Sequence, residues 1–82
     1  MSLKLSIEAL EVIDAIARKG SFAAAAEALY RVPSALTYTV QKLESDLGVQ
    51  LFDRSGHRAT LTEAGAELLK EGRYLLEAAH AL

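Results

Sequence analysis

Apolar positions in the first quarter of the chain repeat with the spacing of an α-helix. They recur every three residues along one face, at Ile7, Leu10, Ile13 and Ile16, and acidic residues occupy the other faces. Such a face predicts an amphipathic helix, here over residues 7–19. Gly20 follows directly, and glycine is the residue that most often ends a helix.

Two shorter helical segments follow. Ser21 is a candidate N-cap for a helix from Phe22 to Leu29 or Tyr30, which contains a run of four alanines. Pro33 is well tolerated in the first turn of a helix, so a third helix is expected over residues 33–47, ended by Gly48. Its apolar face consists of Leu36, Val40, Leu43 and Leu47. Short second and third helices joined by a tight turn form a helix-turn-helix.

The period changes after residue 48. Apolar residues flank a Ser-Gly turn, which predicts a small β-hairpin over residues 52–60. Thr62 is the expected N-cap of a long final helix over residues 63–82. The fold expected is therefore mainly α: three helices, a β-hairpin and a long helix.

Composition limits the chemistry available to this chain. Its 82 residues form one small domain, 51% hydrophobic and without cysteine, so no disulfide or thiolate metal site is expected. No apolar run is long enough to span a membrane, and a soluble, cytoplasmic protein is expected. The two histidines are far apart in sequence, so a metal site is not expected. Neither histidine is paired with an obvious nucleophile and carboxylate, and there is no glycine-rich phosphate loop. The chain is therefore not expected to be an enzyme or to bind a cofactor.

Net charge argues weakly against a nucleic-acid partner. The chain carries nine Lys or Arg and eleven Asp or Glu, a formal charge of −2. Acids concentrate near both ends, whereas residues 31–58 hold four cations and one histidine against three acids. Phosphate binding depends on where cations lie, so composition permits a DNA-binding protein without requiring one.

Dispersed motifs resemble the N-terminal domain of LysR-type transcriptional regulators over about residues 7–76. They are Gly20-Ser21-Phe22, Ala25-Ala26, Leu29, Ala35-Leu36, Leu43-Glu44, Leu47-Gly48, Leu51-Phe52, Arg54 and Leu61-Thr62-Glu63-Ala64-Gly65. The resemblance implies a winged helix-turn-helix over residues 1–62, a linker helix over 63–82 and a C-terminal effector-binding domain absent from this chain. Met1–Leu3 are candidates for cloning residues.

One segment departs from the family pattern. Where most members have Ser-Gln-Pro-Ala-Leu-Ser-Arg, this chain has Val32-Pro-Ser-Ala-Leu-Thr-Tyr38. This variant, together with Leu51-Phe-Asp-Arg-Ser-Gly-His-Arg58, resembles the branch of the family that includes YhaJ-type regulators. The preference for particular DNA sequences is therefore expected to depend more on hydroxyl groups, on Tyr38 and on DNA shape than it does in typical members of the family.

The candidate DNA contacts lie on the third helix, in the turn before it and in the hairpin. A recognition helix enters the major groove with its N-terminal residues facing base edges. The helical candidates are Pro33, Ser34, Thr37, Tyr38 and Gln41, and Arg31 precedes them. Alternatively, Ser34 and Thr37 are ordinary surface residues, Tyr38 packs against the second helix, and Arg31 is a solvated turn cation.

The resemblance makes the 52–60 hairpin the wing, which lies along the DNA backbone or minor groove. Its candidate contacts are Arg54, His57 and Arg58, although charged hairpins are usually just solvated. Lys42 has two equal interpretations: a phosphate contact, or an ion pair with Glu44 or Asp46.

The resemblance also implies that the final helix pairs with a second copy, which forms a homodimer that binds an inverted-repeat operator. A tetramer and the binding of a small-molecule effector are expected only for the full-length protein. The expected dimer residues are Leu68, Leu69, Leu75, Leu76 and Ala79. Alternatively, this apolar stripe packs only on its own domain. The competing function is a winged helix that binds protein rather than DNA.

Overall fold

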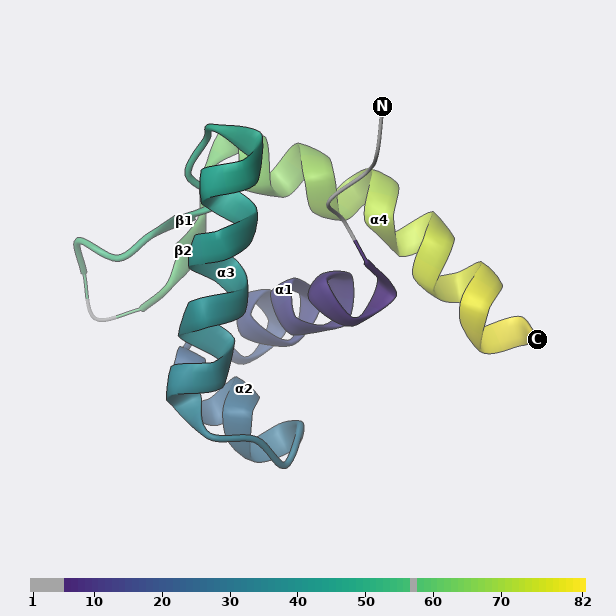
Figure 1. Ribbon diagram of the computed structural model, residues 1–82, viewed down its shortest axis with the longest axis horizontal. Coiled ribbons are helices and arrows are strands. Elements are labelled where there is room, and N and C mark those ends of the chain that lie inside the picture. Colours follow the sequence, from purple (N-terminus) through teal and green to yellow (C-terminus); the bar gives the residue numbers. More distant parts are fainter. Residues whose placement is uncertain (1–5, 57) are drawn as a thin grey trace.

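The computed structural model describes residues 6–56 and 58–82 and bears out the expected architecture (Figure 1). The candidate contact His57 and residues Met1–Leu3 lie outside the described residues. The order of elements is α1 (Ile7–Lys19), α2 (Phe22–Ala28), α3 (Pro33–Leu47), β1 (Phe52–Asp53), β2 (Thr60–Leu61) and α4 (Glu63–Ala81).

Capping side chains fix where three of the helices begin. The hydroxyl of Ser21 accepts a hydrogen bond from the backbone N–H of Ala24 at 3.0 Å, and that of Thr62 accepts one from Gly65 at 3.1 Å. Both predicted N-caps are thus confirmed. Ser6 caps α1 in the same way through Ala9. Each cap satisfies an N–H that the helix itself leaves without a partner.

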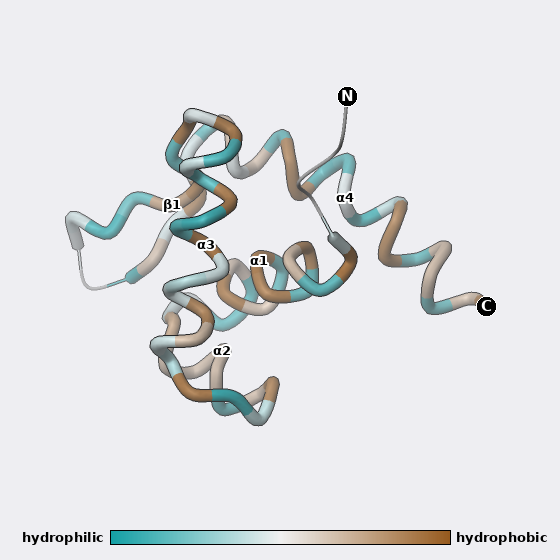
Figure 2. The backbone as a smooth tube through the Cα atoms, viewed as in Figure 1, coloured by the Kyte–Doolittle hydropathy of each residue, from teal (hydrophilic) through white to brown (hydrophobic). Residues whose placement is uncertain are grey.

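Helix α1 runs through the middle of the fold, with α2, α3 and α4 packed around it (Figures 1 and 2). Its side chains Leu10, Ile13 and Ile16 are fully buried. Ile13 and Ile16 share one core cluster with residues from the other elements: Ala25, Ala26, Leu36, Val40, Leu43, Leu51, Phe52 and Leu69. One continuous core holds the helix-turn-helix, the base of the hairpin and α4 together.

Two local expectations differ from the structure. Leu47 is 45% exposed rather than buried, because Gly48 ends α3 in a left-handed conformation and the chain turns away there. Helix α2 stops at Ala28, before the expected Leu29 or Tyr30. Tyr30 adopts a left-handed φ of 56°, and the N–H of Arg31 bonds back to the carbonyl of Ala26. This arrangement is a Schellman motif, which ends the helix one or two residues earlier than expected.

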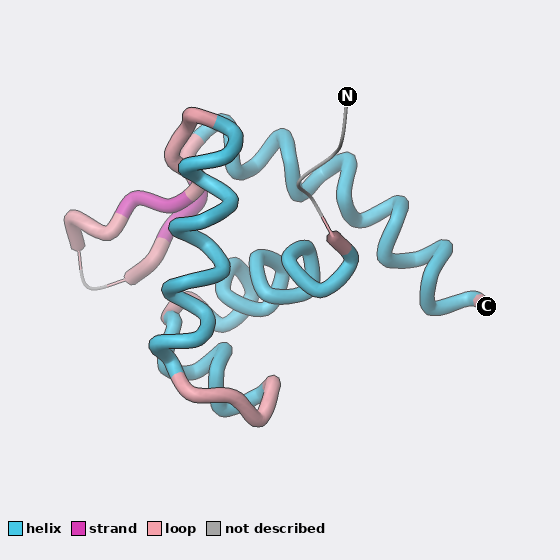
Figure 3. The backbone as a smooth tube through the Cα atoms, in the orientation of Figure 1, coloured by secondary structure: helices cyan, strands magenta, loops and turns pink. Residues whose placement is uncertain are grey.

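The hairpin is short. Phe52 pairs with Leu61 and Asp53 with Thr60 in antiparallel register, and strands occupy only its base (Figure 3). We call residues 52–60 the wing. A two-stranded ladder of this length is marginal on its own, so the wing depends on contacts with the helices.

Candidate nucleic-acid interface

The outward face of α3 carries polar, mostly uncharged side chains. Successive residues of a helix are rotated by about 100° around its axis. Ser34, Tyr38 and Gln41 therefore lie on the side of α3 opposite its buried residues Leu36 and Val40. All three are exposed, and Tyr38 keeps 67% of its surface accessible rather than being buried against α2. The remaining candidates differ in exposure: Pro33 is exposed at the first position of the helix, and Thr37 is half-buried.

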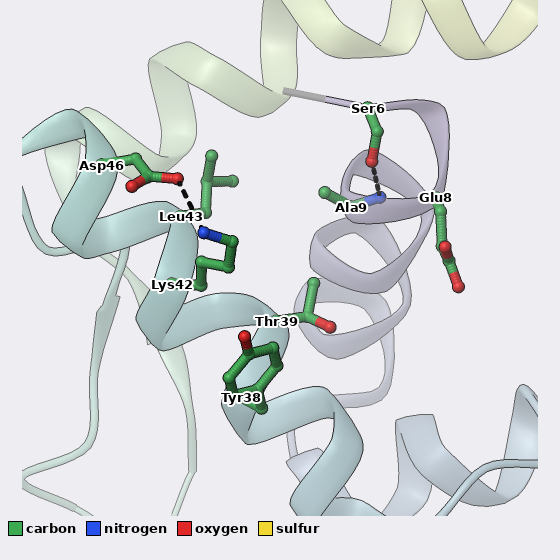
Figure 4. Close-up of a pocket in the computed structure, with 8 residues that line it drawn as sticks. All are labelled: Ser6, Glu8, Ala9, Tyr38, Thr39, Lys42, Leu43 and Asp46. Carbon is green, nitrogen blue, oxygen red and sulfur yellow. Dashed lines mark hydrogen bonds and ion pairs between the residues drawn. The ribbon is translucent and has the colours of Figure 1, made fainter. Parts of the chain in front are cut away.

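Side chains of α3 also border a depression next to the start of α1 (Figure 4). Tyr38 and Lys42 line it on α3, and Glu8 lines it on α1. The ammonium of Lys42 lies 3.7 Å from the carboxylate of Asp46, one turn further along α3. Of the two interpretations of Lys42, the ion pair is therefore formed in this structure. An exposed pair of this type contributes little to stability.

Arg31 does not extend freely from the turn before α3. Its guanidinium forms an ion pair with Glu8 at the start of α1. The turn is thereby fastened to the first helix, and part of the charge expected for a phosphate contact is already neutralised. Both side chains keep about half of their surface exposed, so this pair is screened by salt.

The two described wing arginines pack against the junction of α1 and α2. The guanidinium carbon of Arg54 lies 3.8 Å from the ring centroid of Phe22, the first residue of α2. The guanidinium of Arg58 lies against Gly20, where an added Cβ would overlap it. The backbone N–H of Ala59 donates to the carbonyl of Gly20 at 3.0 Å, which ties this arm of the wing to the end of α1.

Two polar side chains hold the base of the wing. The Glu44 carboxylate accepts hydrogen bonds from the N–H groups of Leu51 and Phe52, at 2.7 and 3.3 Å. The Thr62 hydroxyl donates to the carbonyl of Gln50 at 2.6 Å while it caps α4. In the sequence, Glu44 was part of a family motif and a possible partner for Lys42, and its contact with the wing base was not predicted. The only sequence signal for this contact is the place of Glu44 late in the predicted third helix, a few residues before the expected hairpin.

The wing also carries one carboxylate close to its arginines. A hydrogen bond of 2.9 Å from the backbone N–H of Ser55 to Asp53, with a further contribution from the Ser55 side chain, lowers the pKa of Asp53 below its ordinary value of 3.8. Asp53 is therefore negatively charged at neutral pH. Its charge partly offsets the positive charge of the wing.

Helix α4 uses only part of its apolar stripe for its own domain. Leu69 and Leu76 are buried there. Leu75 is 52% exposed and Tyr74 is 67% exposed, while Leu68 and Ala79 are partly covered. Of the five residues expected at a dimer interface, two are therefore occupied within the chain. Tyr74, which was not among them, adds an exposed aromatic ring.

Within residues 6–56 and 58–82, no group of three or more His, Cys, Asp or Glu side chains is arranged to hold a metal ion. In the same part of the chain, no helix has both the length and the apolar composition needed to cross a membrane.

The fold and its motifs define the class of protein. Residues 7–66 match the family described as bacterial regulatory helix-turn-helix protein, lysR family. The chain belongs to this family. Among solved structures it is similar to the CbnR DNA-binding domain in complex with DNA (TM-score 0.87, 38% identity, covering 94% of this chain and 88% of that one). It is also similar to the BenM DNA-binding domain with benA site 1 DNA (TM-score 0.89, 26% identity, 94% and 86%).

Sequence comparison places the chain more closely within the family. It is 65% identical over 78 residues to the probable transcriptional regulator YhaJ of Escherichia coli strain K12, covering 95% of this chain and 26% of the relative. It is 57% identical over 68 residues to PunR of the same strain, covering 83% and 22%. The predicted YhaJ-like branch is thus confirmed. The chain spans about a quarter of the length of these curated relatives.

Proposed function

We propose that this chain binds double-stranded DNA sequence-specifically, as the DNA-binding part of a LysR-type transcription regulator. Helix α3 enters the major groove, and the wing lies along the backbone or minor groove. The observation that carries this proposal is the outward face of α3, where Ser34, Tyr38 and Gln41 are exposed opposite the core. Hydroxyl and amide groups can bind base edges. The wing arginines Arg54 and Arg58 are suited to bind phosphates.

Salt dependence tests this assignment. We expect binding of a labelled duplex, carrying the T-N11-A inverted repeat that the family resemblance suggests, to weaken steeply as salt rises. Fluorescence anisotropy follows the binding. Each phosphate contact lowers the slope of log K against log salt by about 0.9. The double variant Arg54→Ala with Arg58→Ala is expected to weaken binding to all duplexes alike and to flatten the slope by up to about 1.8.

Arg18→Ala is the matched control, since it removes the same charge from the side of α1, where Arg18 pairs with Asp14 at 3.1 Å. If this control weakens binding as much per charge as the wing variant, only net charge matters and the wing assignment is wrong. Thr37→Ala and Tyr38→Ala are expected to change the preference among duplexes selected from a random pool. Unchanged preference in both variants would contradict the placement of α3 in the groove.

We further propose that residues 1–62 form the DNA-binding unit and that residues 63–82 form a linker helix that pairs with a second copy. The exposed Leu75 and Tyr74 and the partly covered Leu68 and Ala79 support this pairing. Leu75→Glu is expected to shift the chain from dimer to monomer in analytical ultracentrifugation. Val49→Glu, which charges another exposed apolar residue, is the control. Equal effects of the two substitutions would contradict the α4 interface.

In the longer relatives the remaining length could supply a tetramer contact and a small-molecule effector site. We propose both for a full-length regulator that contains this chain. Two recognition helices in one dimer would then contact half-sites separated by about one helical turn of DNA or a multiple of it.

A further inference from the structure

The segment Gly20-Ser21-Phe22, which we call the α1–α2 corner, lies under the wing. It supported the family resemblance, yet none of its residues is a candidate DNA contact. Both described wing arginines rest on it, Arg54 on the Phe22 ring and Arg58 on Gly20. None of the ion pairs among residues 6–56 and 58–82 involves Arg54 or Arg58. In the described part of the chain, the contact recorded for the Arg54 guanidinium is therefore with an aromatic face rather than with a carboxylate.

We propose that Phe22 is a positioning residue for DNA binding, which holds the Arg54 guanidinium in place for a phosphate. The inference rests on the proposed function. A cation over an aromatic face is attracted by the negative charge of that face, and a stacked guanidinium keeps N–H donors free along its edge. A carboxylate partner would occupy those donors. The ring fixes the direction of the side chain while leaving its charge and its hydrogen bonds available.

The Phe22 ring is itself held in a fixed orientation. It meets the ring of Phe52 edge to face, with centroids 5.7 Å apart and an interplanar angle of 70°. Phe52 is buried in the core at the base of the wing, and its N–H is held by Glu44. The chain of contacts therefore runs from the core through Phe52 and Phe22 to Arg54.

Ordering Arg54 in the free protein has a direct effect on affinity. An arginine side chain loses considerable rotamer freedom when it is immobilised on a ligand. Where the ring has already restricted that freedom, less is lost on binding DNA. Loss of the ring should therefore weaken binding only when Arg54 is present to benefit from it.

A double-mutant cycle between Phe22 and Arg54 tests this coupling. Phe22→Leu is expected to raise the Kd for the duplex about two- to tenfold, and to move the salt slope toward that of Arg54→Ala. In the Arg54→Ala background, Phe22→Leu is expected to leave both Kd and slope unchanged. Phe22→Tyr, which keeps the aromatic face, is expected to bind like the original chain.

Ile13→Val controls for loss of stability, because it trims the buried core of α1 without touching either arginine. It is expected to lower the unfolding midpoint while leaving Kd unchanged below that midpoint. In the free protein, NMR offers a readout that needs no DNA. The side-chain protons of Arg54 should show an upfield ring-current shift that Phe22→Leu abolishes.

The outcomes separate the two proposals. If Arg54→Ala itself leaves affinity and salt slope unchanged, the wing assignment in the proposed function fails. If Arg54→Ala weakens binding but Phe22→Leu has the same effect with and without Arg54, only the positioning role fails. Should Phe22→Leu fail to fold, wild-type-like ring-current shifts and affinity in Phe22→Tyr still support the role, and their loss in that variant overturns it.

Discussion

Gly65, in the first turn of α4, has no room for a larger side chain. A Cβ added there would overlap the carbonyl oxygen of Leu51 and lie 3.0 Å from a methyl carbon of Leu61. The obstructing atom is backbone and cannot rotate away. The same carbonyl accepts a hydrogen bond from Thr62 at 3.0 Å, so a shift of Leu51 also weakens the connection between the wing base and α4.

The expected effect of Gly65→Ala is a balance of three contributions. Alanine stabilises a helix by at most about 1 kcal/mol relative to glycine, and by less in the first turn. Forcing extra volume into a packed site costs about 1–3 kcal/mol. Weakening the hydrogen bond from the Thr62 N–H to the Leu51 carbonyl costs about 0.5–1.5 kcal/mol. We therefore expect the free energy of unfolding to fall by about 1–3 kcal/mol, with a melting temperature lower by roughly 5–20 °C.

Thermal and urea unfolding followed by circular dichroism at 222 nm measure this change. Gly56→Ala is the matched control. It makes the same substitution at a position where no atom, apart from those of the chain neighbours, lies within 4 Å of the added Cβ. It should stay within about 0.5 kcal/mol of the original chain. A Gly65→Ala variant that melts at or above the temperature of the original chain would refute the close approach of Leu51 to α4.

Three further predictions concern the turn and the wing. Tyr30→Gly should raise the free energy of unfolding by about 0.5–1 kcal/mol, because glycine adopts the left-handed conformation of this position without steric cost. Tyr30→Ala should give no such gain. The midpoints of urea unfolding compare the two variants. Glu44→Ala should lower that free energy by about 1–3 kcal/mol in the same assay, because it removes the acceptor for two N–H groups at the wing base. NMR titration should place the pKa of Asp53 below 3.8, and Ser55→Ala should raise it toward that value. Since the folded pKa is lowered, the stability from Asp53 is complete above the unfolded pKa and is lost as pH falls below about 4. Stability that still varied with the Asp53 charge between pH 5 and 8 would contradict this.

Local patterns were sufficient to predict the order of elements. Apolar spacing located the helices, and hydroxyl caps at Ser21 and Thr62 marked two of their starts. The prediction for Leu47 failed because periodicity cannot tell where a helix leaves the core. A left-handed Tyr30 was also unexpected, since glycine usually occupies that position.

The contacts of the candidate interface were less accessible to sequence reasoning. Arg31 with Glu8, and Arg54 with Phe22, join residues from different elements, and no spacing rule relates them. Residue type could suggest that an arginine contacts phosphate. Only the folded chain shows that one arginine is already paired with an acid while another rests on an aromatic ring.

The short ladder of the wing has a consequence for cooperativity. Two residue pairs cannot form an independent folding unit, and the wing base is held by α3, by the start of α4 and by the end of α1. Amide hydrogens at Leu51, Phe52 and Ala59 should therefore exchange with solvent through the same opening that exposes the helical core. DNA affinity and helicity would then disappear together on heating, in a single transition.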